Sequence, residues 1–263
     1  MKLKDLINKT GDYDVSRFQL LKIISKIENK DMSYYLLNDD IKEGTIKKLL
    51  RVLNGYPLEY LINEVKFLNN KFYVDERVLI PRIETEDLVL YAKKTIEEEN
   101  IKSIVDIGTG SGVIAISLKK YFPNMNVYAI DISEKALDVA KLNAKKLNVD
   151  INFYCGEYIE PIKDKISEIE MIVSNPPYVE ESFKNNRLKY EPSIALYAGI
   201  DGQNFFKNLL KYEQLKGKIM LFETTEFNYK KTEEILKFFG NTKILKDSFD
   251  KKRFIEINNN NFI

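Results

Sequence analysis

From residue 101 onward, short apolar runs alternate with helix-type patterns, and this alternation restricts the fold more than any other feature of the chain. Seven runs are predicted to be strands: SIVDI, NVYAI, NFYC, EMIVS, KIMLFE, TKILK and FIEIN. Helices are predicted between them at about residues 111–121, 133–147, 201–215 and 228–239. Because strands that alternate with helices form βαβ units, the sequence predicts an α/β fold with a mostly parallel, seven-stranded sheet and helices on both faces.

Residues 1–65 carry only helix-type patterns, so they are predicted to form a separate domain of three or four helices. In the run VSRFQLLKIISKIENK, apolar residues recur at three- and four-residue spacing, and Ser16 is placed to cap the start of the helix. A second helix is predicted in DIKEGTIKKLLRVLNGYP, where Gly55 and Pro57 occupy positions that end helices.

A linker is predicted between this domain and the alternating region. Residues 66–80 contain two apolar-aromatic runs that are split by Asn69 and Asn70, which is typical of a β-hairpin. Pro81 and the acidic residues after it then indicate the start of a helix. The third part of the chain, residues 81–263, is therefore predicted to contain the sheet.

Composition excludes several kinds of chemistry. The chain has no His and one Cys, so His-dependent triads, the usual zinc sites and an internal disulfide are excluded, and we expect no metal. Cys155 lies in a strand-type run and is predicted to be a small core residue in a reducing compartment.

The balance of charge and the lack of long apolar runs restrict the partners. A net charge of +1 argues against a protein that holds nucleic acid by charge alone. With no apolar leader and no long apolar run, the chain is expected to be cytoplasmic and not membrane-bound.

The first strand of the alternating region runs into the glycine-rich turn DIGTGSG. Gly108, Gly110 and Gly112 allow the backbone to approach a ligand closely, and the helix that follows points its N-terminus at that ligand. The spacing is G-x-G-x-G, whereas a dinucleotide site needs a third glycine at position 113, which is Val. The turn thus predicts a cofactor site that is not the usual dinucleotide one.

Two aspartates accompany this turn. Asp131 ends the second strand, where its carboxylate could accept both hydroxyls of a ribose. The alternative is that it caps the next helix, although Ser133 can cap that helix itself. We expect the ribose contact for Asp131, and for Asp106 a role in orienting the loop or in facing the amino-acid end of a cofactor.

The run EMIVSNPPY ends a buried strand with two prolines, which cannot continue a β-ladder. Rigid prolines could hold the Asn175 side-chain oxygen and the Pro176 carbonyl at the carboxyl end of the strand, where ligands bind in this architecture. Each acceptor could take one N–H of a planar amide, and Tyr178 could stack on that plane. For an isolated match, a purely structural turn is the alternative.

Three stretches, VDIGTGSG, AIDIS and SNPPY, together resemble the Rossmann-like class I, S-adenosylmethionine-dependent methyltransferases, and N-P-P-Y is the signature of members that methylate planar nitrogens. Within this class, RVLNGYPLEYLINEVKFLNNKFYVDERVLIPRIETEDLV and YEPSIALYAGIDGQNFFKNLL resemble the release-factor glutamine methyltransferases, over essentially the whole chain. Two positions depart from the family pattern: Ile83 stands where the family has Pro in P-R-P-E-T-E, and Thr225 stands where it has Gly after the fifth strand. The acidic residue that the family has two positions before that Gly is kept as Glu223.

The resemblance implies methyl transfer from S-adenosylmethionine, which becomes S-adenosylhomocysteine, to the amide N5 of the glutamine in the Gly-Gly-Gln motif of peptide-chain release factors, and hence a role in translation termination. Release factors would be the partner, recognised by the helical N-terminal domain of a monomer, with no direct contact to nucleic acid. The implied catalytic residues are Asn175, Pro176 and Tyr178, and these three bind the substrate together with Pro177. The implied cofactor-binding residues are Gly108, Thr109, Gly110, Ser111, Gly112, Asp131, Glu157, Tyr158 and Asn175.

The same resemblance places Glu157 at the adenine amino group and Tyr158 on the adenine ring. The long connection ESFKNNRLKYEPSIALYAGIDG is expected to help form the substrate groove. No general base is needed, because an amide nitrogen becomes acidic only as it is methylated, so the lack of His is no obstacle.

Two alternatives stay open from the residues alone. An adenine-N6 methyltransferase would use the same Asn-Pro-Pro-Tyr chemistry, but it needs a flipped base and a strong phosphate-binding surface, which fit a chain of charge +1 poorly. The second alternative is a non-catalytic nucleotide-binding module or an NAD oxidoreductase. Val113 and the N-P-P-Y run argue against both of these.

Overall fold

A computed structural model describes residues 13, 15–38, 40–183, 185 and 188–259. The chain divides into two compact units, one of Met1–Glu64 with Asn185–Tyr190 and one of Val65–Lys184 with Glu191–Ile263. Among the described residues, no helix has both the length and the apolar character needed to cross a membrane.

The smaller unit is helical. It contains α2 (Arg17–Glu28), α3 (Tyr34–Leu37), α4 (Glu43–Leu53) and α5 (Leu58–Ile62). Ser16 caps α2 in a reciprocal capping box, in which its hydroxyl accepts the Gln19 N–H and the Gln19 side chain accepts the Ser16 N–H. The apolar stripe predicted in this helix packs against α4, because Leu20, Ile24 and Leu49 are all buried in one cluster.

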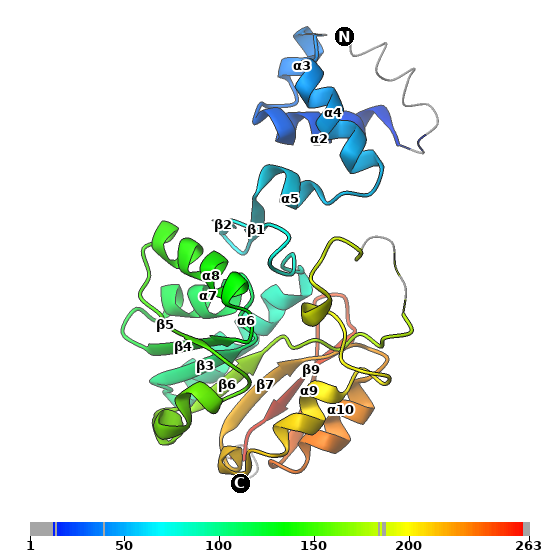
Figure 1. Cartoon of the computed structure of the whole chain (residues 1–263). Coiled ribbons are helices and arrows are strands. Elements are labelled where there is room, and N and C mark those ends of the chain that lie inside the picture. Colours follow the sequence, from blue (N-terminus) through cyan, green and yellow to red (C-terminus); the bar gives the residue numbers. More distant parts are fainter. Residues whose placement is uncertain (1–12, 14, 39, 184, 186–187, 260–263) are drawn as a thin grey trace. The chain divides into compact units, whose positions relative to one another are not determined.

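The larger unit is built on a seven-stranded sheet, and every predicted strand occurs (Figure 1). The strands are β3 (Ser103–Ile107), β4 (Asn126–Asp131), β5 (Asn152–Cys155), β6 (Met171–Ser174), β7 (Ile219–Glu223), β8 (Thr242–Lys246) and β9 (Lys252–Ile257). Their order is β5-β4-β3-β6-β7-β9-β8, and only β9 runs antiparallel to its neighbours. The predicted α/β fold with a mostly parallel sheet is confirmed.

Helices cover both faces of the sheet (Figure 1). One buried cluster contains residues of α6 (Glu84–Glu99), α7 (Val113–Tyr121) and α8 (Glu134–Lys146). The other contains residues of α9 (Asn204–Leu209), α10 (Tyr229–Leu236) and the 3-10 helix Glu160–Glu168. The prediction of one long helix at residues 201–215 was wrong, because α9 ends at Leu209 and a separate 3-10 turn, Glu213–Leu215, follows it. The 3-10 helix Glu160–Glu168 was not predicted.

A hairpin precedes α6, formed by β1 (Val65–Phe67) and β2 (Asn70–Phe72). Its turn is one residue earlier than predicted, because Phe67 pairs with Asn70 and leaves Leu68 and Asn69 at the turn. Leu68 takes the left-handed conformation there, with φ +49°.

The prediction that Cys155 is a core residue was wrong. β5 is the edge strand of the sheet, and Cys155 is its last residue, so the thiol is exposed. A strand-type run fixes the backbone but does not say whether the strand is central or at an edge.

Candidate active site

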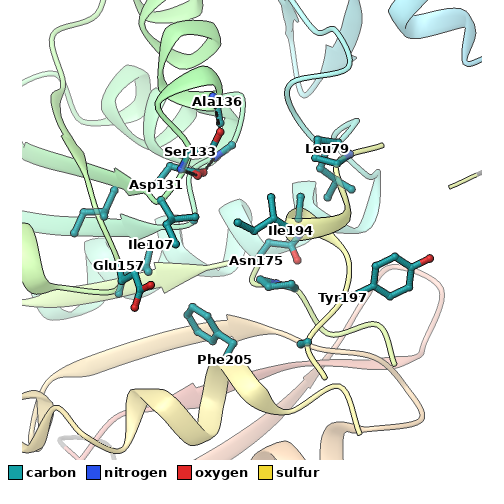
Figure 2. Close-up of a pocket in the computed structure, with 18 of the residues that line it drawn as sticks. Leu79, Ile107, Asp131, Ser133, Ala136, Glu157, Asn175, Ile194, Tyr197 and Phe205 are labelled. Carbon is teal, nitrogen blue, oxygen red and sulfur yellow. Dashed lines mark hydrogen bonds between the residues drawn. The ribbon is translucent and has the colours of Figure 1, made fainter. Parts of the chain in front are cut away.

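The carboxyl ends of the central strands border a cavity of about 400 Å³ (Figure 2). The chain crosses from β3 to β4 in one direction and returns to β6 on the other side of β3, which is the place where ligands bind in open α/β sheets. The cavity lies wholly within the larger unit. Seven predicted site residues line it: Gly108, Gly110, Asp131, Glu157, Tyr158, Asn175 and Pro177.

The glycine turn presents its backbone to this cavity. Gly108 and Gly110 have positive φ, and a Cβ on either would meet nothing within 4 Å. Gly112 serves a different purpose, because a Cβ there would lie 2.9 Å from Ile116 Cδ1 and 3.2 Å from Ala140 Cβ, so this glycine allows α7 and α8 to pack closely. Thr109, Ser111 and Gly112 are not among the residues that line the cavity.

Asp106 lies beneath the turn and is fully buried. Its Oδ2 accepts the Thr109 hydroxyl at 2.6 Å and the Ala115 N–H at 3.2 Å, so one carboxylate ties both ends of the turn. Burial raises the pKa of Asp106 to about 7. Asp106 does not line the cavity, and these bonds support its expected role in orienting the loop.

Asp131 stands at the end of β4 with its carboxylate beside the cavity (Figure 2). Its Oδ2 accepts the Gly110 N–H at 2.8 Å and its Oδ1 accepts the Ser133 N–H at 2.9 Å. Ser133 itself caps α8 by accepting the Ala136 N–H at 3.2 Å. Asp131 is therefore not the helix cap, and burial raises its pKa. Each carboxylate oxygen still has a lone pair for a ligand hydroxyl.

Glu157 and Tyr158 follow β5 on another wall of the cavity. Tyr158 has φ +51°, and its ring lies 5.2 Å from the ring of Phe205 and 5.5 Å from that of Tyr212. These neighbours fix the ring of Tyr158, and burial raises its pKa.

The Asn-Pro-Pro-Tyr corner, residues 175–178, directly follows β6. Asn175 donates its Nδ2–H to Thr85 Oγ1 at 2.9 Å, and its Oδ1 takes no hydrogen bond from the described residues. Pro177 lines the cavity, whereas Pro176 is buried and Tyr178 is half-buried, and neither of these two lines it. The Tyr178 hydroxyl donates to Glu223 Oε1 at 3.1 Å. Stacking of the Tyr178 ring on a substrate amide stays a prediction.

The connection after the corner forms a further wall. Its backbone pairs with the residues just after Tyr178, because the Val179 N–H donates to Leu196 O at 2.8 Å and the Ala198 N–H donates to Val179 O at 2.9 Å. The connection is also anchored near its middle by Glu191, whose side chain binds Arg82 at 2.6 Å. Lining residues from this connection include Pro192, Ile194, Ala195 and Tyr197.

Sequence reasoning missed some of the cavity wall. Arg77 lines it from the segment after the hairpin and is held by Asp75 at 2.7 Å. It lies within the first of the two stretches that carried the family resemblance, but it was not singled out there. Phe205 lines it from α9, within the NFFKNLL run that carried part of the family resemblance.

The two departures from the family pattern lie outside the cavity wall. Ile83 is 62% exposed and precedes α6 without capping it through its side chain. Thr225 accepts the Asn228 N–H through both its carbonyl and its hydroxyl oxygen, each at 3.1 Å, and so closes the turn that leads to α10. Neither side chain is among those that line the cavity.

Known proteins confirm the class that this sheet and this corner define. Residues 90–254 match the model of the family described as "Methyltransferase small domain". The hMettl16 catalytic domain, solved with the MAT2A 3'UTR hairpin 6, aligns with a TM-score of 0.54 at 14% identity and covers 84% of each chain. The T. Thermophilus 16S rRNA N2 G1207 methyltransferase, solved with AdoMet and guanosine, aligns with a TM-score of 0.54 at 13% identity over 74% of this chain and 49% of that one. These likenesses show the fold of a class I methyltransferase.

Sequence relatives narrow the class to one family. The release factor glutamine methyltransferase of Dictyoglomus turgidum is 36% identical over 249 residues, which cover 89% of this chain and 88% of that protein. The protein of the same name from Flavobacterium psychrophilum is 36% identical over 258 residues, with 91% and 89% covered. The chain belongs to the release factor glutamine methyltransferase family.

Proposed function

We propose that this chain transfers a methyl group from S-adenosylmethionine to the amide N5 of the glutamine in the Gly-Gly-Gln motif of peptide-chain release factors. The observation that carries the proposal is Asn175, which lines the cavity and keeps its Oδ1 free of hydrogen bonds from the described residues. The substrate follows from the family, because the relatives are named for this reaction.

The cavity suits the cofactor. The open space at Gly108 and Gly110 would let the backbone contact the methionine part, and the Asp131 carboxylate has lone pairs for the ribose hydroxyls. Glu157 and Tyr158 would contact the adenine amino group and ring. When bound, S-adenosylmethionine supplies a methyl group that its sulfonium charge has already activated.

The corner would do the remaining work by positioning the substrate nitrogen. Asn175 Oδ1 would accept one amide N–H, and the Pro176 carbonyl would accept the other. Among the residues that the structure describes, none donates a backbone hydrogen bond to that carbonyl. Two such bonds would draw the nitrogen out of conjugation and aim its lone pair along the line of attack. The fixed φ of the prolines keeps the carbonyl in place.

The smaller unit is proposed to recognise the body of the release factor. The balanced charge of the chain, +1 overall, is consistent with a protein partner and gives no support to a phosphate-binding surface. The adenine-N6 alternative presents the same planar N–H₂ group, but none of the relatives cited above is named for it.

The direct test uses labelled S-adenosylmethionine with a release factor or with DNA. We expect label only in the factor, and a mass increase of one methyl group on the tryptic peptide that contains Gly-Gly-Gln. A factor with Gln→Ala in that motif is the control and should stay unlabelled. Label that appears only in DNA would overturn the proposal.

Gly202 is expected to be needed for the shape of the corner. It has φ +68°, and a Cβ there would lie 2.4 Å from the carbonyl oxygen of Tyr178. Because this neighbour is backbone of the corner itself, Gly202→Ala should displace the corner and lower kcat about 10- to 100-fold. Initial rates at saturating cofactor and release factor measure the effect.

Gly217→Ala is the matched control. Gly217 has φ +82°, so alanine there meets similar backbone strain, yet its Cβ would meet nothing within 4 Å. This control should lower the melting temperature and leave kcat near that of the unmodified protein. Equal loss of kcat in both variants would mean that backbone strain alone, and not contact with the corner, reduces turnover.

A further inference from the structure

Asn175 is connected to two buried residues from other elements. Its Nδ2 lies 2.9 Å from Thr85 Oγ1 at the start of α6, and Thr85 Oγ1 lies 2.8 Å from Glu223 Oε2 at the end of β7. Thr85 is 2% exposed and Glu223 is 1% exposed. The three side chains form a relay that ends at the wall of the cavity.

The proton count of this relay fixes the orientation of the Asn175 amide. An ionised Glu223 carboxylate has no proton, so the single Thr85 hydroxyl proton must point at it. Thr85 Oγ1 can then only accept a hydrogen bond from Asn175, which must present its NH₂ group. The Oδ1 atom is thereby left for a ligand, and the ambiguity between the oxygen and the nitrogen of the amide is removed.

We propose that Thr85 and Glu223 are positioning residues of the methyl transfer: they hold the Asn175 carboxamide with its oxygen available to accept the substrate N–H. This inference rests on the proposed function and deepens it. Neither residue lines the cavity, so both act through Asn175.

Glu223 also holds the other side of the corner. Its second oxygen, Oε1, accepts the Tyr178 hydroxyl at 3.1 Å. One carboxylate thus fixes both ends of the four-residue corner, with Asn175 held through Thr85 and Tyr178 held directly. The two hydrogen bonds explain how a carboxylate is accommodated at this buried position.

Among the described residues, Arg253 on β9 and Glu84 on α6 are the charged side chains that act on the pKa of Glu223, and they do so with opposite signs. Arg82 and Arg253 act on the neighbouring Tyr178. Arg253 is itself held by Asp247 at 2.7 Å. Burial, the largest influence, raises the pKa of Glu223 to about 7.

A pH dependence follows from the relay. Once protonated, Glu223 can donate to Thr85, the Thr85 proton is then free to point at Asn175, and the amide can reverse. We therefore expect kcat to fall as pH falls through about 7.

The contribution of Glu223 to the stability of the fold should have the opposite pH dependence. Its pKa is about 7 in the folded state and 4.5 ordinarily, so between pH 4.5 and 7 the folded state binds more protons than the unfolded state. The free energy of unfolding should therefore decrease as pH rises through this range.

The first test removes the Thr85 hydroxyl. Thr85→Val keeps the shape of the side chain, and we expect kcat to fall about 10- to 100-fold while the dissociation constant of S-adenosylmethionine is nearly unchanged. Thr85→Ser should restore most of the rate, because it restores the hydroxyl. Thr95→Val is the matched control, since Thr95 lies on the same helix and donates to buried Glu256 at 2.9 Å, away from the cavity. An equal loss of kcat in Thr95→Val and Thr85→Val would overturn the proposal.

The second test is Glu223→Gln. This variant should lose kcat at pH 8 and lose the acidic limb of its pH profile near 7, while its melting temperature at pH 8 is no lower than that of the unmodified protein. A pH profile identical to that of the unmodified protein would overturn the proposal.

A third readout needs no substrate and separates this inference from the proposed function. The side-chain amide signals of Asn175 in a ¹⁵N NMR spectrum, identified by their loss in Asn175→Asp, should titrate with a midpoint near 7 and stop titrating in Glu223→Gln. Signals that do not titrate in the unmodified protein refute the relay. A relay that titrates in a protein without activity on release factors refutes the proposed function alone.

Discussion

Replacing Asn175 with alanine is expected to lower methyl transfer to a release factor by about 10²–10³-fold or more, with the affinity for S-adenosylmethionine largely kept. The variant removes the side-chain acceptor that would draw one N–H of the substrate amide toward the corner. Because an amide nitrogen has a delocalised lone pair, little reaction should occur without that bond. Single-turnover rates at saturating labelled cofactor, together with calorimetric binding of the cofactor, measure the two quantities separately.

The control for this variant is Asn152→Ala. Asn152 is an exposed asparagine at the amino end of β5, so its removal leaves the carboxyl edge of the sheet intact. It should keep both rate and affinity. If Asn175→Ala lost cofactor binding but kept its turnover per bound cofactor, Asn175 would be a cofactor ligand and not an amide acceptor.

The strands could be predicted because buried parallel strands are short, apolar and β-branched. Met171–Ser174 is buried throughout, and its end at two prolines fixed both the strand and the corner. Cys155 shows the limit, since the same kind of run gave an edge strand with an exposed thiol. Position within a sheet depends on strand order, which is set by packing across the whole unit.

The candidate site could be predicted only where each residue sits at a strand end. Gly108, Asp131 and Asn175 follow or end β3, β4 and β6, and parallel strands bring these ends to one edge. The Thr85–Glu223 hydrogen bond joins residues 138 positions apart, and no local pattern announces it. Motifs therefore located several residues of the cavity wall, whereas the residues that hold Asn175 in place became visible only in the folded chain.

Replacing Asp131 with alanine is expected to weaken S-adenosylmethionine binding by roughly 1.5–3 kcal/mol, or about 10- to 150-fold, for each charged hydrogen bond lost. The carboxylate would accept the ribose hydroxyls while it also holds the N–H groups of Gly110 and Ser133. Its loss thus removes a ligand contact and loosens the glycine turn together. Calorimetric titration with the cofactor measures the dissociation constant, and the melting temperature without cofactor reports the loosening.

Asp31→Ala is the control for the loss of a turn away from the cavity, because Asp31 makes the same kind of turn in the smaller unit. Its carboxylate accepts the Ser33 N–H at 2.8 Å, as that of Asp131 accepts the Ser133 N–H, but it lies in the smaller unit. Asp31→Ala should therefore lose a little stability and no cofactor affinity. An Asp131→Ala variant with an unchanged dissociation constant would mean that this carboxylate only shapes the loop. The ribose hydroxyls would then need another acceptor, and among the other carboxylates that line the cavity Glu157 is the nearest to Asp131 in sequence.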